Sequence, residues 1–190
     1  MMNLLLARPT GVEIKIKKKK LIFTKTDLKG DIVSVSDSFV KISGYSSSEL
    51  IGSAHNMIRH PDMPKTIFRI MWSKIRQGKN AKAIIKNLAK NGNHFWLSSS
   101  IDIKKDSNGN TRNYIAYRKP VSKKRTIELD ILYKKLRDIE TTHGIEAGID
   151  YLNGYLDENK MSYCDLIIRS MKSENKIFSS LKNLLKKRDN

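Results

Sequence analysis

The stretch from His55 to Pro64 carries the densest group of side chains that could do chemistry. Within eight positions it holds two histidines, an arginine, an asparagine and an aspartate. The guanidinium of Arg59 is a natural partner for an anionic group, and His55 and Asn56 offer directional hydrogen bonds, as expected around a phosphate or a heteroaromatic ring. In an alternative that the composition leaves equally open, Asp62 caps the following helix and pairs with Arg59, and the histidines lie at the surface.

We expect neither a metal site nor an enzyme. His55 and His60 are five residues apart, which is neither the three-residue nor the four-residue spacing that places two helical imidazoles on one metal. No cysteine or second acid completes a ligand set. The sequence also lacks a catalytic triad, a glycine-rich phosphate loop and a pair of acids arranged for general acid and base work.

The elements that must position these side chains follow an α+β pattern. Residues 21–35 predict a strand, a turn and a second strand. Asp37 is expected to cap one short helix, and another is expected after Ser46, where a capping box is possible. A longer helix with a wide apolar face is expected between Pro64 and Gly78. Short helical turns should therefore hold the stretch from His55 onward.

Beyond Gly78 the period changes from helical to alternating. Residues 83–88, the residues after the Asn91-Gly92 turn, and residues 113–118 predict a three-stranded meander that Pro120 ends. We expect an α+β arrangement in which one face of the sheet packs against helices.

The pattern after Pro120 is helical. Apolar positions mark one helix around 127–136, a second around 145–152 that is broken by Gly144 and Gly154, and a third over 166–185. We expect a helical hairpin that covers either the domain or a partner.

Charge is concentrated in the first part of the chain. The 190 residues have a net charge of +18, and residues 1–120 alone hold 23 basic and 8 acidic residues. Such an excess favours an anionic partner: nucleic acid, the inner membrane leaflet, an acidic protein or a phosphate-bearing ligand. Nucleic acid is not expected, because neither a recognition helix nor an aromatic platform for bases is evident.

The sequence favours a cytoplasmic location. No segment approaches the roughly 20 apolar residues that cross a bilayer, and the apolar run from Leu4 to Ala7 is too short for the core of a signal peptide. Cys164 is the only cysteine, which excludes an internal disulfide.

Several motifs give the chain a family resemblance. They are Thr26-Asp27-Leu28-Lys29-Gly30, Phe39-Val40-Lys41-Ile42-Ser43-Gly44-Tyr45, the stretch from His55 to Pro64, Met71-Trp72, Ile85-Lys86-Asn87 and Lys90-Asn91-Gly92. With the order of elements, they resemble the PAS domain of bacterial aerotaxis receptors and the small soluble PAS proteins of energy taxis. The resemblance covers roughly residues 21–119. It implies a PAS fold, an antiparallel five-stranded sheet with flanking short helices, plus a helical C-terminal extension.

The resemblance also implies boundaries, a cofactor and a site. A basic N-terminal arm (1–20) would precede the PAS sensor domain (21–120), and a helical extension (121–190) would follow it. Relatives hold FAD non-covalently and report redox state to a chemoreceptor. Carried over position by position, the implied flavin-binding residues are His55, Arg59, His60, Asp62, Trp72 and Asn87.

Two departures from the family pattern weaken expected flavin contacts. Ser36 stands where aerotaxis receptors usually have asparagine, and Ala81 stands where they have tryptophan. An alternative is a PAS adaptor that holds haem, through His94 or His60, or holds nothing. Because Cys164 lies outside the pocket region, the cysteine–flavin adduct of light-sensing relatives is not expected.

The implied partner is a membrane chemoreceptor with a HAMP and signalling region, contacted through the helices after Pro120. The sequence also leaves open that the chain forms a homodimer, and that it makes peripheral contact with an anionic membrane.

Overall fold

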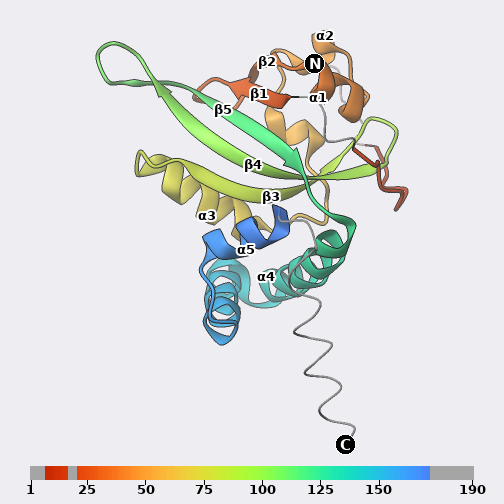
Figure 1. Ribbon diagram of the computed structural model, residues 1–190, viewed down its shortest axis with the longest axis vertical. Coiled ribbons are helices and arrows are strands. Elements are labelled where there is room, and N and C mark those ends of the chain that lie inside the picture. Colours follow the sequence, from red (N-terminus) through yellow and green to blue (C-terminus); the bar gives the residue numbers. More distant parts are fainter. Residues whose placement is uncertain (1–6, 17–20, 172–190) are drawn as a thin grey trace, which may run out of the picture.

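The computed structural model describes residues 7–16 and 21–171. Its centre is a five-stranded antiparallel sheet in the order β2-β1-β5-β4-β3 (Figure 1). The strands are β1 (Ile22–Thr26), β2 (Ile32–Val35), β3 (Ala81–Leu88), β4 (His94–Lys105) and β5 (Thr111–Pro120). The helices are α1 (Asp37–Ser43), α2 (Ser47–Leu50), the 3-10 helix η1 (His55–Ile58), α3 (Lys65–Arg76), α4 (Lys123–Glu158) and α5 (Tyr163–Met171). The predicted α+β fold is confirmed.

Local capping explains the short helices between β2 and α3. The side chain of Ser36 accepts a hydrogen bond from the backbone N–H of Phe39, and Gly44 ends α1 in the left-handed conformation, at φ 73°. Ser46 and Glu49 form the predicted capping box at the start of α2. Because these caps keep α1 and α2 short, the chain reaches η1 soon after β2.

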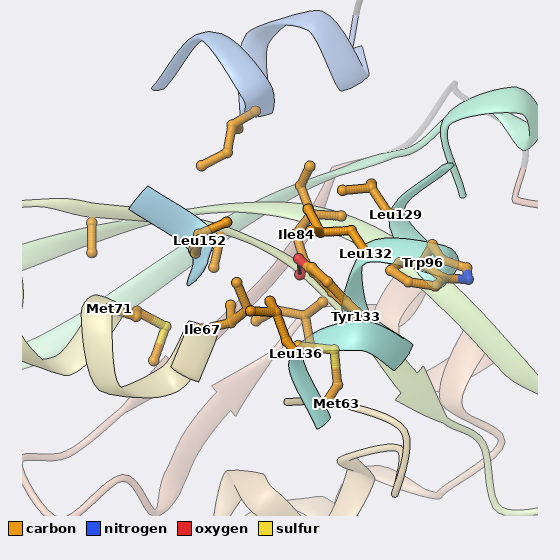
Figure 2. Packing of buried hydrophobic residues seen from close by; sticks show 14 of the residues in the cluster. Met63, Ile67, Met71, Ile84, Trp96, Leu129, Leu132, Tyr133, Leu136 and Leu152 are labelled. Atoms are coloured by element: carbon orange, nitrogen blue, oxygen red, sulfur yellow. Dashed lines mark hydrogen bonds between the residues drawn. The ribbon is translucent and has the colours of Figure 1, made fainter. Parts of the chain in front are cut away.

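Both faces of the sheet are covered, where the sequence predicted one. The inner face packs against α1 and α3, and α4 covers part of the outer face. The Tyr133 hydroxyl on α4 donates to the Ile84 carbonyl at 2.7 Å, and its ring lies 5.7 Å from that of Trp96 (Figure 2). The C-terminal helices therefore cover the domain itself.

The helix α4 consists of two helical segments joined at Gly144, where φ is 85° and ψ is 173°. The break at Gly144 was predicted, but the break at Gly154 was wrong because Gly154 lies inside the second segment. Glu140 accepts hydrogen bonds from the backbone N–H groups of Lys65 and Thr66, and so caps α3. The predicted helix over 166–185 is described only as far as Met171, and residues 172–190 lie outside the described residues.

Part of the expected N-terminal arm is anchored to the domain. Thr10 donates its backbone N–H to Gly92, and Ile14 and Val12 exchange backbone hydrogen bonds with His94. Residues 1–6 and 17–20 of the arm lie outside those described.

A single segment pairs with both edge strands of the sheet. At one edge, the Ile32 N–H donates to Ser53 and the Gly52 N–H donates to Ile32. At the other edge, Arg59 forms an antiparallel bridge with Asn87 on β3. Residues 52–60 therefore cross beneath the sheet from β2 to β3.

Candidate functional site

A cavity of about 390 Å³ lies between the inner face of the sheet and the helices η1 and α3. Most of its wall is apolar and comes from Ile58, Phe68, Met71, Ile75, Ile85 and Ile101. Its polar side chains include Thr24, His55, Arg59, Asn87, Ser99 and Arg118. Among the described residues that line it, none is an aspartate or a glutamate. The cavity thus suits a largely apolar ligand that also carries electron-rich or anionic groups.

Arg118 is the central polar group of this wall. The residue is 7% exposed, and it donates to Thr24 Oγ1 at 2.7 Å and to the Ala116 carbonyl at 3.0 Å. Burial lowers the pKa of Arg118 to about 9, which leaves the guanidinium charged at neutral pH. Within the described part of the chain it has no carboxylate partner. A buried, uncompensated cation is a site for an anionic or electron-rich ligand group.

His55 lies beside this guanidinium as an acceptor. Its Nε2 is 2.8 Å from Arg118 Nη2, and arginine can only donate. Burial and then the charge of Arg118 lower the pKa of His55 to about 3. The imidazole is therefore neutral at physiological pH and adds no second charge to the wall.

Three further predicted site residues line the same cavity. The Arg59 guanidinium donates to the Met63 carbonyl at 3.1 Å and stacks on Phe68, 4.2 Å from the ring centroid. Asn87 is buried, with Nδ2 donating to the Ile85 carbonyl at 3.2 Å. Trp72 completes the α3 side of the wall. The structure thus brings together four of the six predicted residues.

His60 and Asp62 do not line the cavity. After η1 the backbone becomes extended at Arg59, and the His60 N–H donates to the Lys86 carbonyl at the edge of β3. Successive side chains of extended backbone point to opposite sides, so Arg59 faces the cavity and His60 faces away from it. The helical turns expected for this whole stretch end at Ile58, because the backbone beyond η1 is extended.

Instead, Asp62 belongs to a charged cluster between β3 and α4. The buried Lys86 Nζ lies 2.9 Å from Asp62 Oδ2 and 3.0 Å from Asp130 Oδ1 on α4. Arg137, also on α4, donates to the Asp62 carbonyl. Partial burial raises the pKa of Asp62, but the hydrogen bond and charge of Lys86 outweigh it, so the carboxyl titrates below its ordinary value. This cluster joins the segment that forms the cavity wall to the helical extension.

Sequence reasoning missed Arg118, although a signal was present. Tyr114, Ala116 and Arg118 alternate along β5 and face the cavity together. Because Arg118 shares the alternating face of its strand with Tyr114 and Ala116, the sequence could have indicated that its side chain points inward. The two departures at Ser36 and Ala81 concern positions outside the cavity lining.

Comparison with known proteins places this architecture. The family model for the PAS fold matches residues 32–118. Residues 32–118 form a PAS domain. The aerotaxis receptor of Escherichia coli is 35% identical over 135 residues, which are 71% of this chain and 26% of that receptor. The bacterioopsin transcriptional activator of Halobacterium salinarum is 22% identical over 70% of this chain and 19% of its own length.

Solved structures agree with the fold. A light-oxygen-voltage domain, studied with a flavin analogue, superposes with a TM-score of 0.54 at 23% identity, over 58% of this chain and 84% of that one. The light-state LOV domain of Aureochrome1 gives 0.54 at 23% identity, over 60% and 90%. The PAS domain is thus related to that of the aerotaxis receptor, and the chain spans about a quarter of that receptor's length.

In the described ranges no helix is both long and apolar enough to pass through a bilayer. No cluster of three or more histidine, cysteine or acidic side chains suited to a metal occurs in those ranges.

Proposed function

We propose that this PAS domain holds a flavin, FAD, in the cavity and acts as a redox sensor. The carrying observation is Arg118, a charged guanidinium buried in the wall of a largely apolar cavity and without a carboxylate partner among the described residues. A flavin ring is planar and apolar on its faces, and it carries carbonyl oxygens and ring nitrogens on one edge. The residues present fit such a group: aliphatic and aromatic side chains for its faces, and Arg118, Arg59 and Asn87 as donors for its oxygen and nitrogen atoms.

The redox chemistry would be that of the flavin, whose reduction adds electrons and often a proton to the ring. The guanidinium of Arg118 favours added negative charge nearby, because it is held in a water-poor wall where screening is weak. Neutral His55 accepts from Arg118 and holds it in place. A change in ligand charge therefore changes the hydrogen bonds at this edge.

The outer face of the sheet offers a route from the cavity to α4. Asn87 faces the cavity, and its neighbour Lys86 points to the opposite side and pairs with Asp130 on α4. Two strand positions away, the Ile84 carbonyl accepts from Tyr133. A displacement of β3 would therefore change both the Lys86–Asp130 ion pair and the Ile84–Tyr133 hydrogen bond. The proposed signal is a shift between two positions of α4 on the sheet.

The proposed receiver is a membrane chemoreceptor with a HAMP and signalling region, contacted on its cytoplasmic side. The relation to the aerotaxis receptor supports this assignment. The outer surface of α4 presents Ile127 and Ile131, which are four residues apart on one helix face and are 54% and 69% exposed. These isoleucines are the contact we assign to the receptor. The basic excess of residues 1–120 would assist the encounter near anionic lipid, and this assistance should fade as salt rises.

The absorption spectrum of freshly purified protein tests the cofactor. Oxidised flavin bands in the blue and near ultraviolet, bleached by dithionite, are expected. A Soret band would support a haem adaptor, and a colourless chain that FAD cannot reconstitute would contradict the proposal.

Co-purification from membranes with the chemoreceptor tests the partner. The double variant Ile127→Lys with Ile131→Lys should lose the receptor, whereas Tyr151→Lys, at another exposed position on α4, should keep it. Equal recovery by both variants would contradict the assigned surface.

A further inference from the structure

One hydroxyl group on the cavity wall is buried and lacks a hydrogen-bond partner in the described part of the chain. Ser99 lies in the middle of β4, lines the cavity and is only 1% exposed. Its Oγ has no hydrogen-bond partner among the described residues. A buried polar group without a partner costs free energy, so such a group in a cavity wall points to a ligand that completes it.

The sheet places this hydroxyl next to Arg118. Ser99 is the direct cross-strand neighbour of Arg118 in the β4–β5 pairing, and both residues line the cavity. Side chains that oppose each other in an antiparallel pair lie side by side on the same face. Ser99 and Arg118 therefore present donors from neighbouring positions of the cavity wall.

We propose that Ser99 is a ligand-positioning residue, which donates its hydroxyl hydrogen to the acceptor edge of the bound flavin beside Arg118. A ring nitrogen or a ring carbonyl oxygen is the acceptor chemistry that this pair of donors recognises. This inference rests on the proposed flavin site and adds to it a second, uncharged donor. Ser99 thereby tunes the ring electronically and contributes to its orientation.

The chain contains a matched control on the same strand. Ser98 is also buried, but the alternation of β4 points it to the outer face, and it does not line the cavity. Ser99→Ala and Ser98→Ala therefore remove the same atom from opposite faces of one strand.

The test combines FAD titration of the full-length apo chain with the spectrum of the bound flavin. Ser99→Ala should raise the Kd roughly three- to tenfold, the range of one neutral hydrogen bond. It should also shift the long-wavelength flavin band to shorter wavelength, because a donor to the ring edge has been removed. Ser98→Ala should leave both the Kd and the band unchanged.

The outcomes separate this inference from the proposed function. Flavin binding with the same Kd and spectrum for Ser99→Ala and the unchanged chain would overturn the role of Ser99 alone. An equal loss in both variants, with the band unmoved, would mark a structural effect of the strand and overturn it too. Failure of the unchanged chain to bind FAD would overturn the proposed function and this inference with it.

Discussion

Arg118 places a positive charge on the cavity wall, where the side chain is buried from solvent. Its donors are directed to Thr24, to the Ala116 carbonyl and to neutral His55, all of which are uncharged acceptors. Desolvation of the guanidinium is therefore compensated only in part within the protein. In the proposed function a bound flavin completes this compensation, so flavin affinity should depend most on Arg118.

We expect Arg118→Gln to weaken FAD binding by about 1.5–3 kcal/mol, or roughly ten- to a hundredfold in Kd, because a charged hydrogen bond is lost. Fluorescence titration of apo protein measures this. The adjacent, exposed Lys119→Gln is the control, since it removes a charge from the other side of β5. Equal affinity for the two variants would place the ligand away from Arg118.

A second residue-scale prediction concerns acid. Burial, followed by the charge of Arg118 for His55 and of Lys86 for His60, lowers the two histidine pKa values to about 3 and about 4. Unfolded histidines bind protons below pH ~6.5, whereas these remain neutral in the folded chain. Folding stability should therefore fall as the pH drops from about 6.5 toward 4, by up to about 1.4 kcal/mol per pH unit for each histidine.

Denaturant unfolding at pH 7.5 and pH 5.5 measures this slope. A variant with His55→Asn and His60→Asn should show a clearly shallower loss over that interval, whatever its stability at pH 7.5. An unchanged slope would show that these two groups do not titrate as their burial implies.

At the scale of elements, the second segment of α4 approaches α3 through Gly148. A Cβ added there would lie 2.3 Å from Thr66 Oγ1, whereas one added at Gly154 would meet nothing within 4 Å. We expect Gly148→Ala to destabilise the fold by about 1–3 kcal/mol through overpacking. Gly154→Ala should stabilise it by about 0.5–1 kcal/mol, because alanine favours a helix. Thermal unfolding of both variants should move in opposite directions; a shift of the same sign would refute the close approach.

The Lys86 cluster links β3 to the first segment of α4. Lys86→Met removes the ion pairs with Asp62 and Asp130, both of which are partly exposed, so the expected cost is modest, about 1–2 kcal/mol. Amide hydrogen exchange within α4 should become faster. Lys82→Met, four positions earlier on the same face but exposed, is the matched control. If the exchange rate of α4 amides is unchanged in Lys86→Met, the Lys86 cluster does not take part in the proposed coupling between β3 and α4.

Much of the element pattern could be predicted from sequence because it depends on local chemistry. The capping box at Ser46 and the Asn91-Gly92 turn act within four residues, and both are found. The expected cap of α1 at Asp37 was wrong by one residue, because the Ser36 side chain accepts the hydrogen bond from Phe39 N–H. Gly154 was misjudged because a glycine can also be carried within a helix that tertiary contacts support. The Arg118–His55–Thr24 contacts could not be predicted, since they join three distant segments through a strand order that local pattern does not specify.

For the whole molecule, the helical extension is part of the folded body and not an appendage. It covers Trp96 and Ile84, which are 3% and 1% exposed. A chain ended at Pro120 should therefore show lower thermal stability and self-association, because this apolar surface would meet water. Light scattering and thermal unfolding check it; a monomeric truncation as stable as the full chain would contradict the covering role of α4.

The segment 52–60 occupies the backbone groups of both outermost strands, at Ile32 on β2 and at Lys86 and Asn87 on β3. Unpaired strand edges invite other chains to add strands, which is a route to aggregation. Here one short segment, residues 52–60, pairs with both edge strands. Local opening of this piece would expose both edges together. The segment that contributes Ala54, His55, Asn56, Ile58 and Arg59 to the cavity wall therefore also protects the domain against intermolecular β-pairing.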